Sequence, residues 1–312
     1  MDPLTEVISL LQPRTVFSKG ISGAGAWAVR YSDFGHPSFC AVLEGSCLLA
    51  VDNQQPVTLA AGDFILLPAT PGFTMSSFDA ITPQLINSQT AALATGELRH
   101  GRTEGPADVR LLGGYFEFNS PDAGLLVSLM PGIVHLRQSK RLPVLVNLIN
   151  DECLNPLAGQ DLVLNRLVEV LLIEALRSTA TDQAPPGLLR GLADERIALA
   201  LRAIHRDPAR SWTVAAMARL SALSRTAFFE RFAQTLGLLP MEYLFRWRMA
   251  IAKDLLRRLD IGLTEVADRI GYQSASAFST AFSRHTGQSP SRFAKENRMI
   301  KTGAAEAPPL PF

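Results

Sequence analysis

The stretch Thr264–Pro290 reads TEVADRIGYQSASAFSTAFSRHTGQSP, and it decides the fold of the C-terminal half of the chain. Its pattern predicts a short helix capped by Thr264, a turn at Gly271, and a second helix that Ser274 caps through its side-chain oxygen. The apolar face of the first helix consists of Val266, Ala267 and Ile270. Two short helices joined by a tight glycine turn are typical of a helix-turn-helix motif.

The second of these helices has two different faces. Phe278 and Phe282 lie four residues apart, so both point to one side and are expected in the core. The opposite side carries small or polar residues, namely Ala275, Ser276, Ser279, Thr280 and Ser283. A helix with such an exposed side can lie close to base edges in the major groove of DNA, which is about 12 Å wide.

The same pattern occurs earlier in the chain, in VAAMARLSALSRTAFFERF from Val214 to Phe232. Thr213 and Ser224 are the expected N-caps of its two helices, and Ala222 stands where a glycine would ease the turn. The inward face of the second helix consists of Phe228, Phe232 and Leu236, and the outward face carries Arg225, Thr226, Phe229, Glu230 and Arg231. One such motif is also the pattern of an ordinary helical hairpin, but two in tandem indicate DNA binding.

Between the two motifs, Met241–Leu259 is rich in Arg, Leu and Ala and is predicted to form one helix. At 1.5 Å per residue this helix is about 28 Å long. Successive major-groove faces on one side of a duplex are about 34 Å apart. The helix is therefore a spacer of suitable length to present both motifs to adjacent segments of the groove.

The charge of the chain is divided between its two halves. The 312 residues carry a formal net charge of +1. Residues 1–187 have a balance of −7, from 11 Lys and Arg against 18 Asp and Glu, whereas residues 188–301 have a balance of +9, from 19 against 10. A basic C-terminal domain favours nucleic acid as its partner, although a solvated basic face would have the same composition.

Composition excludes several classes of protein. Hydrophobic residues make up 47% of the chain and charged residues 19%, as in a packed globular protein. No run approaches the ~18 apolar residues of a membrane span, and Met1–Leu4 has no basic region typical of a secretory signal. Cys40, Cys47 and Cys153 are too few for a disulfide framework and lack CxxC spacing, so a reducing cytoplasm is expected.

The first part of the chain has a different periodicity. Residues 1 to about 132 contain short apolar runs bounded by Gly and Pro, which predict strands of a sandwich or barrel, with turns at Gly45 and Gly62. From about 141 to 180 the period becomes helical, and one helix begins near Asp161. This helix has a second apolar face, made of Val163, Val170 and Ile173. That face fits either contact with another subunit or full burial within the monomer.

These patterns predict an α+β chain with two domains. Residues 1–182 form the first domain, a β-barrel with a helical dimerisation segment at about 141–180. Residues 191–299 form an all-α domain with two helix-turn-helix motifs. Residues 183–190, which contain two prolines, are the predicted linker, and residues 300–312 are a predicted disordered tail.

Residues 194–299 resemble the DNA-binding domain of the AraC/XylS transcriptional regulators. The resemblance lies in Val214–Phe232, in TLGLLPMEYL from Thr235 to Leu244, and most specifically in Thr264–Pro290. It implies sequence-specific binding of double-stranded operator DNA, with RNA polymerase as a further partner. By this resemblance the base-reading residues are Arg225, Thr226, Phe229, Glu230, Ala275, Ser276, Ser279 and Thr280. Phosphate contacts are expected from Arg219, Ser224, Arg248, Ser274 and Arg284.

The N-terminal zone resembles the cupin sensor domain of a subgroup of AraC-type activators. The matching segments are AVLEGSC (Ala41–Cys47), LAAGDFILLP (Leu59–Pro68), LGGYFEF (Leu112–Phe118) and LMPGIVH (Leu129–His135). The resemblance implies a small cupin-like β-barrel that senses an effector. The candidate effector or redox residues are Cys40, Trp27, Phe39 and Phe73, each of which also fits a plain core position.

A cupin fold raises the question of metal chemistry. Cupin enzymes bind a metal through His and Glu residues at fixed places, and here Cys40 and Phe73 stand where histidines are common. His36 and His100 lie outside that spacing. Because a metal needs about three or four converging ligands, no metal or other cofactor is expected, and the chain is not expected to be an enzyme.

The sequence therefore predicts a cytoplasmic, homodimeric, DNA-binding transcription regulator, of the activator kind, that responds to a small-molecule or redox signal through its barrel. Two alternatives stay open. One is a cupin-type metalloenzyme with a helical appendage, which bound metal would reveal. The other is a DNA-binding or architectural module whose barrel only dimerises, in which case effectors would leave the DNA affinity unchanged.

Overall fold

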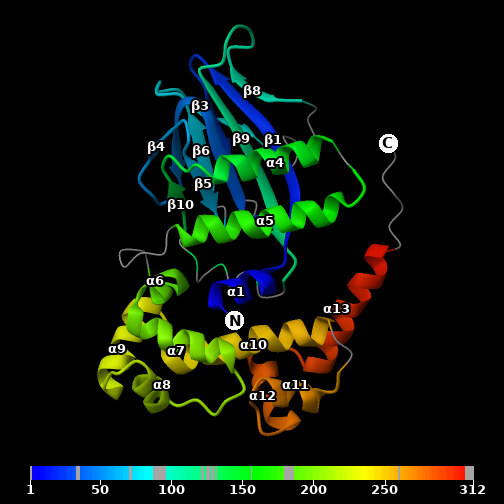
Figure 1. Ribbon diagram of the computed structural model, residues 1–312. Helices are drawn as coiled ribbons and strands as arrows, with labels where there is room; N and C mark the ends of the chain where they lie inside the picture. The colour runs from blue at the N-terminus through cyan, green and yellow to red at the C-terminus, as the bar shows by residue number, and fades with distance from the viewer. Residues whose placement is uncertain are drawn as a thin grey trace. The chain divides into compact units, whose positions relative to one another are not determined.

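The computed structural model describes residues 2–32, 36–69, 72–86, 96–120, 132–155, 157–178, 186–258 and 261–305, together with residues 123, 127 and 130. The chain divides into two compact units (Figure 1). The barrel unit comprises Leu11–Asn119 and Ala123–Pro185. The helical unit comprises Met1–Leu10, Ser120–Asp122 and Pro186–Phe312. The first ten residues therefore belong to the helical unit, whereas the sequence-based boundaries place them in the N-terminal domain.

The barrel unit is built on one curled, ten-stranded sheet (Figure 1). Its strands are β1 (Pro13–Ala24), β2 (Ala28–Tyr31), β3 (Ser38–Val51), β4 (Val57–Ala60), β5 (Phe64–Leu67), β6 (Phe73–Ser76), β7 (Gln84–Ile86), β8 (Leu98–Gly101), β9 (Val109–Phe118) and β10 (Val134–Leu136). Seven of them follow the order β7-β2-β6-β3-β9-β1-β8, and β4, β5 and β10 pair off this path. The cupin-like β-barrel expected from the sequence is confirmed.

Strand β3 turns the corner between the two halves of the sheet. Its first part pairs with β5 and β9, and its second part pairs with β4 and β6. Gly45 lies at the bend with φ +71°, and a Cβ atom there would collide with the carbonyl of Asp108. The prediction of a hairpin turn at Gly45 is therefore wrong, because one strand continues through this glycine. Gly62, with φ +88°, does lie in the turn between β4 and β5.

Two antiparallel helices, α4 (Leu142–Leu154) and α5 (Gln160–Arg177), cover one face of this sheet (Figure 1). Helix α5 begins one residue before the predicted start at Asp161. It buries Leu164, Val168, Leu171, Leu172, Ala175 and Leu176. Val163 and Val170 are each 42% exposed, so the second apolar face is not buried within the monomer.

The helical unit contains the rest of the described helices. They are α1 (Pro3–Leu11), α6 (Leu188–Ala193), α7 (Glu195–Arg206), α8 (Val214–Leu220), α9 (Arg225–Leu236), α10 (Pro240–Arg258), α11 (Leu263–Arg269), α12 (Ala275–Thr286) and α13 (Pro290–Ala305). The all-α domain with two helix-turn-helix motifs is confirmed. Among the described residues, no helix is both long enough and apolar enough to cross a bilayer.

The ends of the predicted domains differ from the observed elements. Helix α6 begins at Leu188, inside the predicted linker, because four of its six residues are apolar or alanine and two of its leucines are buried. Helix α13 continues to Ala305, past the predicted start of the tail. Residues 183–185 of the linker, residues 306–312 of the tail and two residues of the segment 129–135 lie outside the described part of the chain.

Candidate DNA-binding surface and barrel cavity

The turns of the two helical hairpins have the same backbone geometry. In the first, the N–H of Leu223 donates to the carbonyl of Ala218 at 3.0 Å, and in the second the N–H of Tyr272 donates to the carbonyl of Ala267 at 2.9 Å. The residue before each donor is left-handed: Ala222 has φ +51° and Gly271 has φ +78°. The hairpins α8–α9 and α11–α12 are therefore two copies of one motif, and only the second has the residue type that its turn favours.

Serine side chains cap both second helices, as the sequence predicts. The N–H of Ala227 donates to Ser224 Oγ at 3.2 Å, and the N–H of Ala277 donates to Ser274 Oγ at 3.1 Å. Thr213 caps α8 by accepting from an N–H of that helix. The cap predicted at Thr264 is wrong, because α11 starts at Leu263 and Gly262 is its N-cap. Glycine is tolerated at that position, so no side-chain cap is needed.

Phenylalanine pairs anchor the inner sides of α9 and α12. Phe228 and Phe232 are fully buried with ring centroids 5.5 Å apart, and Phe278 and Phe282 are buried at the same separation. These predictions are confirmed. Because each helix is held by its phenylalanine side, its opposite side is presented to the surroundings.

The predicted base-reading residues lie on that outer side. The exposed ones are Arg225, Thr226, Phe229, Glu230, Ser276 and Thr280, and the intermediate ones are Ala275 and Ser279. Phe229 is 40% exposed, so its ring is available for contact with a partner. The hydroxyl of Thr280 donates to the carbonyl of Ser276 at 3.0 Å, so its oxygen remains available as an acceptor. Both helices thus present a set of donors, acceptors and apolar groups to a partner.

The predicted phosphate contacts divide into two groups. Arg219, Ser224, Ser274 and Arg284 are exposed. Arg248 is only partly exposed, and its guanidinium donates to the carbonyls of Pro208 and Arg210, each at 2.9 Å. Burial lowers the pKa of Arg248. We therefore assign Arg248 to holding the loop before α8 in place and leave it out of the candidate phosphate set.

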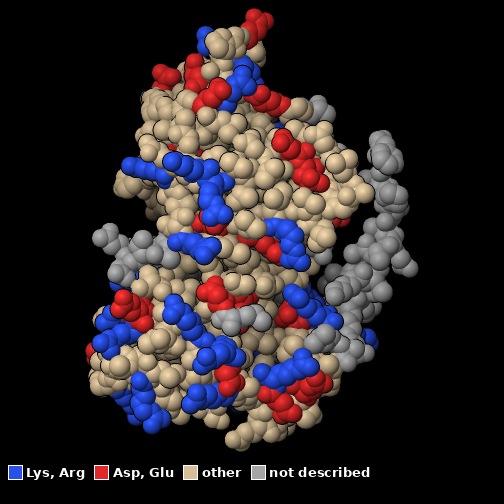
Figure 2. Space-filling view, in the orientation of Figure 1, with Lys and Arg blue, Asp and Glu red and all other residues tan. Residues whose placement is uncertain are grey.

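Arg231 is also engaged within the protein. Its Nε donates to the Asp194 carboxylate at 2.7 Å, and that carboxylate also accepts from the N–H groups of Arg196 and Ile197. Burial would raise the pKa of Asp194, but the hydrogen bonds from Arg231 and the two N–H groups hold it below its usual value. Figure 2 shows other basic side chains on the surface of the helical unit, with acidic ones among them. Residues 188–301 therefore have a net charge of +9 but expose acidic as well as basic side chains.

Helix α10 belongs to the cores of both hairpins. Near its start, the ring of Tyr243 packs edge-on against Phe232 of α9, with centroids 5.8 Å apart. Farther along, Met249 and Leu256 join the buried cluster that contains Phe278. The spacer predicted over Met241–Leu259 is confirmed as one helix of 19 residues, which makes it about 28 Å long. The two second helices therefore pack against one shared helix within one compact unit.

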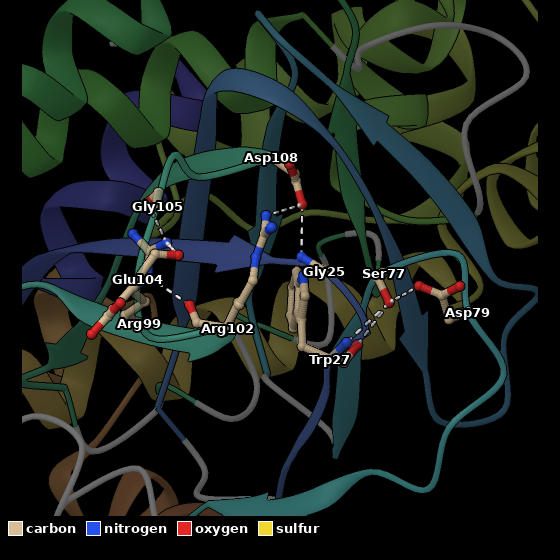
Figure 3. Close-up of polar contacts among 9 residues, drawn as sticks. All are labelled: Gly25, Trp27, Ser77, Asp79, Arg99, Arg102, Glu104, Gly105 and Asp108. Atoms are coloured by element: carbon tan, nitrogen blue, oxygen red, sulfur yellow. Dashed lines mark hydrogen bonds and ion pairs between the residues drawn. The ribbon is translucent and has the colours of Figure 1, made fainter.

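A cavity of about 100 Å³ lies inside the barrel unit. Its wall is almost entirely apolar and includes Phe39, Cys40 and Phe73, three of the four predicted effector residues. Trp27 is not part of this wall. Its ring stacks on His100 at 5.6 Å, and its backbone N–H donates to the hydroxyl of Ser77 at 3.1 Å (Figure 3).

The hydrogen bonds around Trp27 indicate a structural role for that residue. Beside it, the N–H of Gly25 donates to the Asp108 carboxylate at 2.6 Å, and Arg102 lies 3.9 Å from the same carboxylate (Figure 3). Gly101 and Gly23 pack so closely that a Cβ atom on either would collide with neighbouring atoms, including those of Trp27 at Gly23. Trp27 is therefore a buried core residue that does not line the cavity.

The thiol of Cys40 is in an unreactive environment. Burial raises its pKa, and the neighbouring Cys47 raises it further. Burial likewise raises the pKa of Cys47 to about 12. Because the thiolate is the species that reacts with oxidants, these cysteines are poor redox sensors in this conformation. Among the described residues, no group of three or more His, Cys, Asp or Glu side chains is placed to hold a metal ion.

Fold and surface together define a regulator-type architecture: a cupin-like barrel joined to a helical unit with two helix-turn-helix motifs. Residues 2–181 match the cupin family, and residues 217–296 match a helix-turn-helix domain family. The chain belongs to the AraC-like transcription regulators, which are DNA-binding proteins.

Relatives cover the chain from end to end. An AraC-like transcription regulator of Streptomyces lividans is 36% identical over 96% of this chain and 100% of its own length. An HTH-type transcriptional regulator of Haemophilus influenzae is 29% identical over 95% of this chain and 99% of its own length. Among solved structures, the DNA-binding domain of AdpA in complex with a target DNA is 28% identical, covers 34% of this chain and 95% of that chain, and has a TM-score of 0.33. These relatives give no support to a cupin enzyme.

Proposed function

We propose that this protein is a homodimeric activator that reads operator DNA with α9 and α12 and receives a small-molecule signal in its barrel. The observation that carries the first part is the repeated hairpin. Both hairpins share one turn geometry and one buried phenylalanine pair, and both present exposed side chains on the outer side of their second helix. A helix presented in this way fits the major groove.

The chemistry of the two outer sides assigns different tasks to the two helices. Arg225 suits the O6 and N7 acceptors of guanine, and Glu230 suits the N4 donor of cytosine. Ser276 and Thr280 serve several bases through their hydroxyls, and the Thr280 methyl suits the thymine methyl. We expect α9 to read the more strongly polar half of the operator. Helix α12, which has no charged residue on its reading side, is expected to depend more on close approach and shape.

Contacts to the DNA phosphates would fix the position of the protein along the duplex. The proposed phosphate contacts are Arg219, Arg284, Ser224 and Ser274, since all four are exposed. Ser224 and Ser274 cap the reading helices, Arg219 lies on α8, and Arg284 lies in the last turn of α12. Because α10 is about 28 Å long, it suits the ~34 Å between successive major-groove faces. The proposed operator therefore has two half-sites about one helical turn apart.

The apolar face of α5 supports the proposal of a homodimer. Val163 and Val170 are exposed two turns apart on α5, and Leu148 and Val144 are exposed on the adjacent α4. Exposed apolar side chains on two packed helices are costly in water and are typical of subunit contacts. We place the dimer contact on this face, in a cytoplasmic protein that acts as a regulator rather than as an enzyme.

The proposal that this protein activates transcription, rather than represses it, rests on one relative. The RCS-specific HTH-type transcriptional activator RclR of Escherichia coli is 21% identical over 96% of this chain and 99% of its own length. We propose activation through contact with RNA polymerase for this chain as well. A small-molecule signal suits the barrel better than thiol oxidation, because Cys40 is part of a cavity wall and its thiolate is disfavoured.

Footprinting on a selected operator tests the assignment of reading residues. Operator fragments are selected from genomic DNA with the full-length protein, and S276A/T280A is compared with the wild type on single-base operator variants. We expect base preference to relax by about 1–3 kcal/mol at positions in one half-site only. Ser291→Ala, an exposed serine of α13, is the matched control. An unchanged footprint and unchanged base preference for S276A/T280A would show that α12 is not a reading helix.

A further inference from the structure

The loop between α7 and α8 packs against the turn of the other hairpin. Gly271 lies in the turn between α11 and α12, and a Cβ atom there would collide with the carbonyl of Ala209. Ala209 belongs to the loop that leads into α8, the first helix of the first hairpin. The segment that enters the first hairpin therefore touches the turn of the second one directly.

Arg248 of α10 lies in this contact. Its Nε donates to the carbonyl of Pro208 and its Nη2 donates to the carbonyl of Arg210, each at 2.9 Å. A Cβ atom on Gly271 would lie 2.7 Å from the same Nη2. The guanidinium of Arg248 is therefore enclosed between the loop that enters the first hairpin and the turn of the second.

The electrostatic surroundings of Arg248 come from the same two segments. Burial lowers the pKa of Arg248, and two neighbours oppose this shift. One is Asp207 of the α7–α8 loop, and the other is Tyr272 of the second turn. Both hairpins therefore supply neighbours to one guanidinium.

The α7–α8 loop is tied to the start of α8. The indole N–H of the buried Trp212 donates to the carbonyl of Asp207 at 2.8 Å, and the Asp207 carboxylate accepts from the N–H of Arg210 at 3.2 Å. Thr213, which follows Trp212, caps α8 by accepting from the N–H of Ala216 at 3.1 Å. A displacement of this loop would therefore displace the start of α8.

The second turn is packed against its reading helix. Tyr272 directly follows Gly271, and its ring lies edge-on to that of Phe278 in α12, with centroids 5.9 Å apart. Phe278 is fully buried. The turn that contacts Arg248 is therefore continuous with the core that holds α12.

An arginine also holds the turn of the first hairpin, but in a different way. Arg196 of α7 donates through Nη1 to the carbonyls of Ser221 and Ala222, at 3.2 and 2.9 Å. Arg196 thus ties the first turn to the helix that precedes that hairpin. Arg248, in contrast, connects segments that belong to different hairpins.

We propose that Arg248 is a positioning residue for operator binding, which holds the reading helices α9 and α12 at a fixed placement relative to each other. This inference rests on the proposed function, in which both helices read one operator at two half-sites. Helix α10 packs in the core of each hairpin at a different part of its length. The guanidinium adds a second, direct link, and its planar fork fixes the direction of both hydrogen bonds.

Operators of altered spacing test this role on the full-length protein. The probes are the selected operator and two versions with one base pair inserted or removed between the half-sites. One base pair turns the second half-site by about 34–36°, so we expect either change to weaken wild-type binding roughly tenfold or more. Arg248→Met removes both hydrogen bonds, and the same changes should then weaken binding about threefold or less. Arg248→Lys has one ammonium in place of the fork and should lie between the two.

The ratio of the affinities for the altered and the selected operator separates positioning from stability. Partial unfolding of a variant lowers its affinity for every operator by the same factor and leaves this ratio unchanged. Arg246→Met is the matched control, because Arg246 lies on the same helix and donates through Nη2 to Glu242 of that helix at 2.6 Å. This control should keep the wild-type ratio.

Three results would count against the inference. A wild-type ratio in both Arg248→Met and Arg248→Lys would overturn the positioning role and leave the reading by two helices intact. A relaxed ratio in Arg246→Met as well would assign the effect to α10 as a whole and overturn the role of Arg248. Equal binding of all three operators by the wild type would overturn the proposed reading at two half-sites, and this inference with it.

Discussion

The imidazole of His205 in α7 is hydrogen-bonded through Nδ1 to the carboxylate of Glu6 in α1, at 2.8 Å, although 199 positions separate the two residues. Its Nε2 lies 2.7 Å from the hydroxyl of Tyr243, and its ring lies 4.0 Å from that of Trp247. A neutral His205 satisfies both contacts, with Nδ1–H donating to Glu6 and Nε2 accepting from Tyr243. The N-terminal helix is therefore part of the helical unit and completes its buried polar centre.

Glu6→Ala should destabilise the helical unit. The substitution leaves the buried Nδ1–H of His205 without its acceptor, at an expected cost of about 1–3 kcal/mol. Urea unfolding followed by tryptophan fluorescence measures it, in a Trp27→Phe background so that Trp212 and Trp247 report on the helical unit. Glu104→Ala changes an exposed glutamate of the barrel unit and should leave the urea midpoint of that transition unchanged. Equal midpoints for the two variants would contradict a stabilising role of Glu6.

Acidification should also weaken this unit. Burial lowers the pKa of His205, and Glu6 opposes this shift only in part. The unfolded chain, with a histidine pKa of about 6.5, then binds a proton more readily than the native state. Stability is accordingly complete above about pH 6.5 and falls as the pH drops from there toward the lower native pKa. Urea midpoints measured between pH 8 and pH 5 should show this fall, and His205→Gln should reduce its slope.

The two hairpin turns predict opposite effects of exchanging glycine and alanine. Ala222 has φ +51°, where an L-residue is disfavoured by about 1–2 kcal/mol, so Ala222→Gly should stabilise the helical unit by about 1 kcal/mol. Gly271→Ala should destabilise it by more, because the new Cβ would collide with the Ala209 carbonyl as well as strain the turn. Thermal and urea unfolding check both variants. Destabilisation by Ala222→Gly would mean that the alanine methyl makes a contact of its own.

Salt should weaken operator binding steeply. The logarithm of the affinity is expected to fall with the logarithm of the salt concentration, with a slope of about −0.9 per neutralised phosphate. R219A/R284A should make this slope shallower by about 2, since each arginine is proposed to neutralise one phosphate. Arg177→Ala, an exposed arginine of the barrel unit, should leave the slope unchanged. Fluorescence anisotropy on a labelled operator at several salt concentrations provides the measurement.

Charges on the apolar face of α5 should produce monomers. Val163→Glu and Val170→Glu place a carboxylate in the proposed dimer contact, where burial without a partner is costly. Leu199→Glu is the matched control, because Leu199 is 47% exposed on a helix of the other unit. Sedimentation velocity should give a dimer for the wild type and Leu199→Glu. A dimer of unchanged affinity for both valine variants would place the contact elsewhere.

Local patterns predicted most of the helical unit. The caps at Ser224 and Ser274, the phenylalanine pairs and the long spacer all depend on residues close in sequence, and all are confirmed. Helix α1 was missed although its signal is present. Leu4, Val7, Ile8 and Leu11 recur at helical spacing and are all buried. The N–H of Thr5 donates to the Asp2 carboxylate at 3.1 Å, in the manner of a cap.

Other features depend on pairing between distant residues and were out of reach of local patterns. Nothing near Arg248 in sequence indicates that its guanidinium is directed to the carbonyls of Pro208 and Arg210. The cavity wall brings together residues that are far apart in sequence, such as Cys40 of β3, Phe73 of β6 and Tyr115 of β9. The bend at Gly45 lies against the carbonyl of Asp108, which directly precedes β9 and is 63 positions away in the sequence. Strand register was not predictable from composition and periodicity alone.

Side chains of the long helix α10 pack in the cores of both hairpins. This helix therefore fixes how one reading helix is rotated relative to the other. One residue inserted in its middle would turn one hairpin by about 100° and advance it by only 1.5 Å. One base pair inserted between the half-sites turns the second half-site by about 34–36° and shifts it by about 3.4 Å. Neither change can compensate for the other. Operators of this protein should therefore keep an invariant spacing, and changes of target should arise by exchange of side chains on α9 and α12.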